Sequence, residues 1–360
     1  MKTNLVRHKT RSVQIGGVGI GGNNPVRVQS MTNTDTCDAA ATLAQICELA
    51  KAGCEIVRVA VPNEKAAKAL KTICREASLP LIADIHFDSR LAVAAVEAGI
   101  NGLRINPGNI GGERQIDRVV AAAKANSVPI RVGVNSGSVE KTLLKKYGGP
   151  TPQAMVESAL THIRLLEERD FFQMKISLKS SDVRTTVAAY RLLAEKVDYP
   201  LHIGITEAGT PLRGATRSGV GLGILLFEGI GDTVRVSLTG DPVQEMLVAW
   251  ELLRSLGLRE RGPEIISCPT CGRTEVNLIE LAQAVEKHLS SVCEHFTVAV
   301  MGCVVNGPGE AKEADIGIAG GRDSGVIFRK GQMVRKVSGK EKLIPEFLAE
   351  LDMFLAEKRD

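Results

Sequence analysis

Short apolar runs alternate with longer amphipathic stretches along the first two thirds of the chain. In the longer stretches apolar residues recur every three to four positions, which predicts helices, whereas the short runs are typical of buried strands. Eight strands are predicted at 26–31, 56–61, 79–85, 102–106, 129–135, 172–179, 200–207 and 233–239. Helices are predicted between them at 39–52, 65–76, 90–98, 114–125, 152–168, 183–197 and 243–255.

Alternating strands and helices indicate a parallel sheet, and eight such units can close into a (β/α)8 barrel. We therefore predict an α/β protein whose first domain, residues 1–258, is a TIM barrel. A glycine-rich segment at 13–20 precedes the first strand, and we expect it to form a hairpin that caps the barrel floor.

The pattern changes after a charged linker at 258–263. Beyond it the sequence predicts strands at 264–267 and 297–302, and two or three more between 315 and 337. Helices are predicted at 275–289 and 342–357. Residues 259–360 are therefore expected to form a second, small α/β domain of about 100 residues, a common domain size.

The composition limits the classes of function. A net charge of +4 and an aromatic content of 3% argue against a nucleic-acid surface, which needs stronger charge and stacking platforms. No apolar run reaches the roughly 20 residues of a membrane span, and the basic N-terminus lacks the apolar core of a signal peptide. Eight cysteines without a secretion signal suggest reduced thiols in the cytoplasm.

Five predicted barrel strands carry a cation between apolar neighbours. These cations are Arg58, Arg104, Arg131, Lys175 and Arg235. Both faces of a barrel strand are buried, and a buried cation costs several kcal/mol unless an anion pairs with it. Asp84 and Glu207 close two of the strands, but two carboxylates do not neutralise five cations. The excess points to an anionic ligand at the barrel mouth; the alternative is salt bridges between lumen layers or cations near solvent at strand starts.

Polar residues follow the cations at the strand ends. The glycine-rich loop 106–112 suits close approach by phosphate oxygens. Further donors are expected from Asn135, Ser177, Lys179 and Ser237. Arginine binds phosphate in bidentate fashion, so a diphosphate is a natural ligand. His86 either contacts this ligand or is structural, and His202, near the start of its strand, is expected to be structural.

The second domain holds three cysteines and a glutamate on turn-rich sequence. They are Cys268 and Cys271 of Cys-Pro-Thr-Cys, and Cys303 and Glu310 of Cys-Val-Val-Asn-Gly-Pro-Gly-Glu. One interpretation is a structural zinc site with Cys293 as the fourth ligand. The other is a [4Fe–4S] cluster with Glu310 as a hard, exchangeable ligand on one iron.

Together these motifs resemble the signature of the hydroxymethylbutenyl diphosphate synthase family, the reductive enzymes of the methylerythritol phosphate route to isoprenoids. The resemblance extends to segments 28–34, 83–87, 103–109, 204–209 and 235–237, so it covers nearly the whole chain. The length is similar to that of the compact two-domain bacterial form, without the extra middle domain of plant-type relatives.

The resemblance implies a function for each domain. The barrel would bind methylerythritol cyclodiphosphate through Arg58, Asp84, His86, Arg104, Asn106, Arg131, Asn135, Lys175, Arg235 and Ser237, with Asn306 from the second domain. Cys268, Cys271, Cys303 and Glu310 would hold a [4Fe–4S] cluster, with Glu310 also catalytic. Glu207 would donate a proton, or else serve as a counter-ion for the barrel cations. The resemblance further implies electrons from flavodoxin or ferredoxin, and a homodimer in which one subunit's cluster domain closes over the other's barrel.

Two other functions stay open at this stage. One is a zinc-stabilised barrel hydrolase or Schiff-base aldolase acting on a phosphorylated substrate, with Lys175 as the nucleophile. The other is a non-catalytic protein that binds a phosphate ligand or RNA at the basic barrel mouth.

Overall fold

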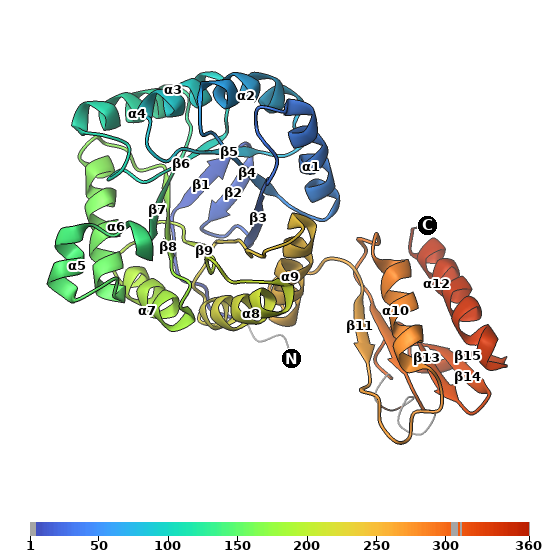
Figure 1. Ribbon diagram of the computed structural model, residues 1–360. Helices are drawn as coiled ribbons and strands as arrows, with labels where there is room; N and C mark the ends of the chain where they lie inside the picture. The colour runs from blue at the N-terminus through green and yellow to red at the C-terminus, as the bar shows by residue number, and fades with distance from the viewer. Residues whose placement is uncertain (1–4, 304–308, 310–311, 360) are drawn as a thin grey trace. The chain divides into compact units, whose positions relative to one another are not determined.

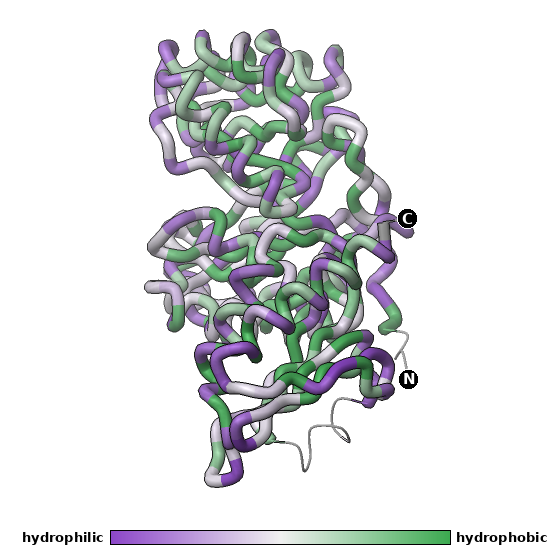
Figure 2. Tube along the Cα trace, turned by 90° about the vertical axis from the view of Figure 1, so that its right-hand side faces the viewer, coloured by the Kyte–Doolittle hydropathy of each residue, from purple (hydrophilic) through white to green (hydrophobic). Residues whose placement is uncertain are grey.

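A computed structural model describes residues 5–303, 309 and 312–359 of the chain. The chain divides into two compact units, Met1–Arg259 and Glu260–Asp360. The division lies one residue after the boundary expected from the sequence. Figure 2 shows hydrophobic segments alternating with hydrophilic ones along both units, as the sequence pattern requires.

The first unit is a parallel barrel with its helices on the outside (Figure 1). Its strands are β3 (Arg27–Met31), β4 (Ile56–Ala60), β5 (Leu81–Asp84), β6 (Gly102–Ile105), β7 (Ile130–Asn135), β8 (Met174–Lys179), β9 (His202–Ile203) and β10 (Thr233–Val234). They pair in the order β8–β7–β6–β5–β4–β3–β10–β9. A parallel bridge between Ile176 and Leu201 brings the sheet round onto itself. The predicted TIM barrel is confirmed.

The outer helices follow the strands along the chain. They are α1 (Ala39–Lys51), α2 (Glu64–Glu76), α3 (Ser89–Glu97), α4 (Glu113–Ala125), α5 (Lys141–Tyr147), α6 (Pro152–Glu167), α7 (Val183–Ala194), α8 (Pro211–Phe227) and α9 (Pro242–Ser255). Several start at a side-chain cap: the carboxylate of Asp38 accepts a hydrogen bond from the N–H of Ala41, and that of Asp182 from the N–H of Thr185.

Helix α8 is missing from the sequence-based prediction. It contains four glycines, and glycine disfavours a helix interior by about 1 kcal/mol relative to alanine. Packing explains one of them: a Cβ on Gly221 would lie 2.8 Å from Cδ1 of Ile205, so the glycine lets the helix approach the barrel closely. Tertiary contact therefore outweighs local propensity here.

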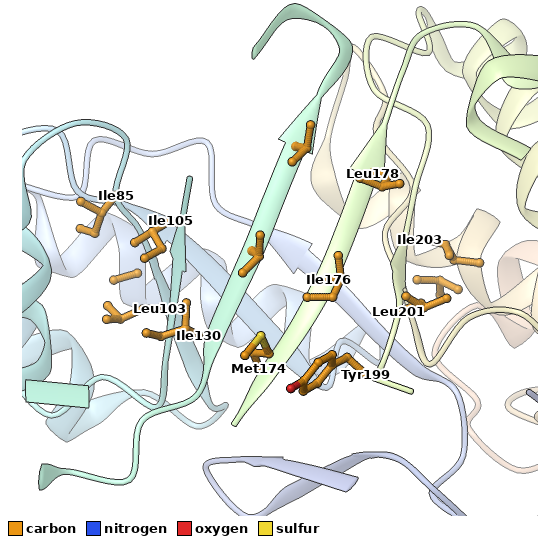
Figure 3. Packing of buried hydrophobic residues seen from close by; sticks show 14 of the residues in the cluster. Ile85, Leu103, Ile105, Ile130, Met174, Ile176, Leu178, Tyr199, Leu201 and Ile203 are labelled. Atoms are coloured by element: carbon orange, nitrogen blue, oxygen red, sulfur yellow. The ribbon is translucent and has the colours of Figure 1, made fainter. Parts of the chain in front are cut away.

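Alternate residues of each barrel strand face opposite sides. On β8, the side chains of Met174, Ile176 and Leu178 belong to the hydrophobic core between strands and helices (Figure 3). Lys175, Ser177 and Lys179, between and after them, face the lumen, and all three are buried. The barrel thus has an apolar layer between its strands and its helices, and a polar lumen.

A hairpin covers the floor of the barrel. Strands β1 (Ser12–Ile15) and β2 (Val18–Gly21) pair antiparallel and cross the centre of the ring in Figure 1. Ile15 and Ile20 of the hairpin form a buried cluster with Ile56 and Ile82 from the beginnings of two barrel strands. The predicted floor cap is confirmed.

The second unit is a five-stranded sheet with two helices. Its elements are β11 (Glu264–Ser267), α10 (Leu278–Leu289), β12 (Thr297–Met301), β13 (Ile316–Gly321), β14 (Ser324–Arg329), β15 (Gln332–Ser338) and α12 (Leu343–Arg359). β11, β12 and β13 are parallel, and β14 and β15 continue the sheet antiparallel. Leu281, Val285, Phe347 and Leu351 of the helices pack with the sheet in a core of its own.

Within the described ranges, every helix is too short or too polar to cross a bilayer.

Candidate active site

Four charged side chains form a row across the barrel lumen. Asp84 on β5 is in register with Arg104 on β6, which is level with Arg131 on β7 and Lys175 on β8. Residues in register on neighbouring parallel strands face the same side of a sheet, so all four enter the lumen. Each is at most 7% exposed.

Asp84 pairs with two of the cations. Its Oδ1 lies 3.0 Å from Nη1 of Arg104, and its Oδ2 lies 3.5 Å from Nε of Arg58. Burial alone would raise the pKa of Asp84, but the charges of Arg58, Arg104 and Arg131 outweigh it and lower the pKa to about 2. The carboxylate therefore stays ionised and fixes two guanidinium groups.

Arg131 is the least compensated of these cations. It is 3% exposed, and its Nε and Nη1 have no hydrogen-bond partner among the described residues. Burial, followed by the nearby charges of Arg58 and Arg104, lowers its pKa well below the ordinary value. Burial also lowers the pKa of Arg58 to about 10, despite Asp84. The salt-bridge alternative thus explains only part of the cation row.

Glu245 is a lumen-edge carboxylate that sequence reasoning missed. It lies in the first turn of α9, accepts hydrogen bonds from Ser30 Oγ at 3.3 Å and Leu238 N at 3.0 Å, and approaches Nη2 of Arg235 to 4.0 Å. Burial raises its pKa, although Arg235 opposes this. An acidic residue in a first helical turn is common, so the sequence contained no distinctive signal for it.

The two lumen lysines of β8 lie at different depths. Lys175 is near the start of the strand, and its Nζ donates to Oε1 of Gln29 at 3.1 Å. Lys179 ends the strand, on the side where ligands of such barrels bind, and its Nζ lies 3.3 Å from Nε2 of His202. The sequence favoured Lys175 for the substrate site; the structure places Lys179 closer to the mouth.

The loops after the strands add polar groups at the same end. His86 lies with Nε2 3.2 Å from Nη1 of Arg104, and the buried Asn106 accepts the N–H of Gly108 on its Oδ1 at 3.1 Å. Asn135 is the last residue of β7, and Ser237 lies three residues after the end of β10. Both are partly buried. These loop residues therefore lie at the end of the lumen where the strands finish, whereas Lys175 lies deeper.

A hydrogen-bonded pair of side chains, His162 and Glu140, lies beneath the glycine-rich loop. His162 on α6 has Nε2 2.9 Å from Oε1 of Glu140, and a Cβ on Gly108 would lie 2.8 Å from that same nitrogen. Glu140 follows the β7 loop, so the pair connects the supports of two loops of the site. Burial opposes ionisation, but the hydrogen bond from His162 prevails and lowers the pKa of Glu140 to about 2.

Glu207 lies in the loop after β9 with an exposed side chain and a φ of 52°. A left-handed conformation is uncommon for a non-glycine residue and is often found at functional sites. Within the described part of the chain Glu207 has no ion pair, so its interpretation as a counter-ion gains no support.

Three of the four cysteines of the second unit, Cys268, Cys271 and Cys303, lie at or just after the same end of its sheet. Cys268 directly follows β11, and its Sγ accepts the N–H of Gly302, at the end of β12, at 3.2 Å. Cys303 is the next residue along. Cys271 is exposed, and hydrogen bonding from Arg273 lowers its pKa, which favours the thiolate. Glu310 and Asn306 lie outside the described residues.

Cys293 lies at the opposite end of β12. It precedes that strand, and its Sγ accepts a hydrogen bond from Nη2 of Arg261 at 3.3 Å. At about 3.3 Å per residue, the five residues of β12 separate it from the other thiols by on the order of 15 Å. The structure therefore gives no support to the four-cysteine zinc arrangement.

The donor set at the thiol end fits an iron–sulfur cluster. Backbone N–H groups directed at cysteine sulfur stabilise the thiolates that such clusters need, and Cys268 and Cys271 both receive one. In residues 5–303, 309 and 312–359, three His, Cys, Asp or Glu side chains are nowhere grouped as around a metal ion. Cys268, Cys271 and Cys303 lie within these ranges and Glu310 does not, so the ligand set stays a prediction.

Two family models match the chain in succession. The GcpE TIM-barrel domain matches residues 10–250, and the GcpE protein C-terminal domain matches residues 264–353. A relative from Maridesulfovibrio salexigens is 70% identical over 98% of this chain and 99% of its own length. One from Geobacter sulfurreducens is 61% identical over 98% of this chain and 100% of its own. Both are named 4-hydroxy-3-methylbut-2-en-1-yl diphosphate synthase (flavodoxin).

A solved structure supports the barrel fold alone. The 3-dehydroquinate dehydratase of Geobacillus kaustophilus aligns with a TM-score of 0.51 at 12% identity, over 69% of this chain and 99% of that one. The names of the close relatives support the reductive synthase, and they do not support the hydrolase or aldolase alternative.

Proposed function

The chain belongs to the GcpE family, and we propose that it reductively opens 2-C-methyl-D-erythritol 2,4-cyclodiphosphate to 4-hydroxy-3-methylbut-2-enyl diphosphate. It is an oxidoreductase of isoprenoid precursor synthesis. Two electrons and two protons convert the cyclic substrate into the linear product and one water. The observation that carries the proposal is the row of buried cations, which exceeds the carboxylates available to pair with it.

The barrel residues bind and orient the diphosphate. Guanidinium groups form bidentate hydrogen bonds with phosphate oxygens, and the unpartnered donors of Arg131 and Arg235 are placed for this. The full proposed set is Arg58, Asp84, His86, Arg104, Asn106, Arg131, Asn135, Lys175, Arg235, Ser237 and Asn306. We add Lys179, because it ends β8 beside the mouth. Asp84 contributes to this set by holding Arg58 and Arg104 in place.

Cys268, Cys271, Cys303 and Glu310 are the proposed ligands of a [4Fe–4S] cluster. When bound, this group supplies electrons singly and offers one iron as a Lewis acid to a substrate oxygen. The three cysteines contribute thiolates, and Glu310 contributes an exchangeable carboxylate. Replacing Glu310 with alanine is expected to keep most of the iron and to lose nearly all turnover; retained turnover would remove Glu310 from the mechanism.

Glu207 is the proposed proton donor to the departing hydroxyl. Its loop follows β9 at the mouth of the barrel, and its backbone has the left-handed conformation that is often found at functional sites. Glu207→Gln is expected to bind substrate normally and to lose turnover, because the amide cannot supply the proton. Glu228→Gln is a matched control, since Glu228 pairs with Arg191 on the outer helices. Equal turnover of both variants would exclude Glu207.

The proposal includes partners and a location. The relatives are named for flavodoxin, so flavodoxin or ferredoxin is the proposed electron donor. We also propose a homodimer whose active site is shared between subunits, and a cytoplasmic enzyme, since its thiols need a reducing compartment.

Metal analysis with electron paramagnetic resonance tests the function first. Anaerobically purified, dithionite-reduced protein is expected to hold about four irons per chain and to show a reduced-cluster signal that the cyclic diphosphate perturbs. One zinc per chain without iron would overturn the proposal.

A further inference from the structure

We propose that His202 is a positioning residue for Lys179, and that the Lys179–His202 pair takes up a proton when the diphosphate enters the lumen. This inference rests on the proposed function, because the anion that drives the uptake is the substrate. The sequence analysis expected His202 to be structural only.

The contacts form a chain across three strands. Nζ of Lys179 on β8 lies 3.3 Å from Nε2 of His202 on β9, and Nδ1 of His202 lies 2.7 Å from Oγ1 of Thr233 on β10. The backbone of His202 is also held, because its carbonyl accepts the hydroxyl of Tyr190 at 2.5 Å. His202 and Thr233 are fully buried, and Lys179 is 7% exposed.

Gly204 provides the room for this arrangement. It lies two residues beyond His202, and a Cβ there would lie 2.6 Å from Nζ and 3.1 Å from Cε of Lys179. Any larger residue would push the lysine out of its place against the histidine. Two separate features thus determine where Nζ of Lys179 lies: the ring nitrogen of His202 that it contacts, and the absence of a side chain at Gly204.

The surroundings of Lys179 are almost entirely cationic. The charged groups that face it are Arg131 on β7, Arg235 after β10, Arg58 on β4, Arg104 on β6 and the carboxylate of Glu245 on α9. Burial, followed by the charges of Arg131 and Arg235, lowers the pKa of Lys179 well below its ordinary value. Burial, followed by Lys179, lowers the pKa of His202 in the same way.

An entering anion reverses this balance. A cyclic diphosphate brings two negative charges next to the cations, which favours the charged form of a nearby lysine. An ammonium group only donates, so Nε2 of His202 must keep its lone pair while Nδ1–H donates to Thr233. The proton therefore goes to Lys179, and His202 stays neutral as its acceptor.

Calorimetry of substrate binding tests the idea on the oxidised holoenzyme without a reductant, where turnover cannot occur. Each phosphorus of the ligand carries one strongly acidic group, so the ligand exchanges no proton near neutral pH. Titrations in buffers of different ionisation enthalpy then count the protons that the protein takes up. We expect a substantial fraction of one proton per site, and binding that weakens as the pH rises.

Variants assign the proton to the pair. Lys179→Met is expected to abolish the uptake. His202→Leu is expected to weaken binding about 10- to 100-fold, the effect of losing one hydrogen bond to a charged group, and to reduce the uptake. His202→Gln, whose amide oxygen can accept, is expected to restore much of both. His288→Gln is the control, because His288 pairs with Asp352 on the surface of the second unit.

Each outcome decides between separate claims. Equal proton uptake by the wild type and Lys179→Met would overturn the inference, as would wild-type affinity and uptake in His202→Leu. Circular dichroism checks folding; if His202→Leu does not fold, Lys179→Met and His202→Gln still decide the question. No binding of the cyclic diphosphate to the wild type would instead refute the proposed function.

Discussion

Oδ1 of Asp84 lies 3.0 Å from Nη1 of Arg104 inside the barrel, with both side chains almost wholly buried. Asp84 is a single carboxylate among several cations, and its pairing with Arg104 has two effects. It offsets part of the cost of burying positive charge, and it presents the remaining guanidinium donors toward the mouth. The proposed binding site is therefore a region where buried positive charge is only partly compensated.

The first prediction concerns acid stability. A pKa of about 2 in the folded protein means that Asp84 contributes stability above its unfolded pKa of about 3.9, which is lost as the pH falls through 2. Asp84→Asn is expected to cost about 2 kcal/mol at pH 7 and to flatten the acid limb of a urea-denaturation pH profile. Asp198→Asn, at an exposed pair with Arg11, should change the profile little. An unchanged acid limb in Asp84→Asn would contradict the assignment.

The second prediction separates stability from function at Arg131. Its guanidinium is buried with unpartnered donors, so replacing it with an apolar side chain of similar length removes an uncompensated charge. Arg131→Met is expected to be more stable by about 1–4 kcal/mol and to bind the diphosphate about 10- to 100-fold more weakly. Thermal denaturation and calorimetry measure the two effects. A destabilised variant would show that the charge is compensated within the protein.

The third prediction uses a glycine. Gly204→Ala would place a Cβ 2.6 Å from Nζ of Lys179 and 2.7 Å from the carbonyl of Arg235, so the lysine and the strand must shift. We expect KM to rise about tenfold, the equivalent of about 1.4 kcal/mol. Gly219→Ala is the control, because no atom lies within 4 Å of its added Cβ and alanine favours the α8 helix. Equal KM values for both variants would mean that Lys179 can move without any loss of substrate binding.

The fourth prediction distinguishes the cysteines of the second unit. Cys271→Ser is expected to lose most of the iron, because a hydroxyl is a poor ligand for it. Cys293→Ser should keep its full iron content, since Cys293 lies at the other end of β12. Iron analysis and the visible spectrum of anaerobically purified variants check both. Iron loss from Cys293→Ser would reopen a ligand set that includes it.

The alternation of strands and helices in the sequence was enough to predict the barrel, since buried parallel strands leave a strong apolar signal. Helices α5 and α8 are missing from the prediction. Helix α8 shows the limit, because its glycines lower helix propensity and the packing of Gly221 against Ile205 cannot be read from the sequence. The predicted strands at 200–207 and 233–239 shorten to β9 and β10, because the chain beyond Ile203 and Val234 forms loops of the site.

The candidate site was partly predictable for a similar reason. Cations between apolar neighbours on a strand are rare enough to stand out, so Arg58, Arg104 and Arg131 were found from the sequence. Glu245 and His202 were not, because their importance depends on neighbours brought together by barrel closure. The depth of Lys175 relative to Lys179 likewise follows from where β8 starts and ends.

The hairpin of β1 and β2 has a kinetic consequence. Because Ile15 and Ile20 pack against Ile56 and Ile82, the hairpin covers the floor end of the barrel, and a ligand of the lumen is expected to enter and leave at the opposite end, where the strands finish. Under the proposed function, reactant and product use that end in turn, and neither can bind while the other occupies the proposed arginine site. The linear diphosphate should therefore inhibit competitively, and its departure sets an upper bound on how fast successive turnovers can follow one another.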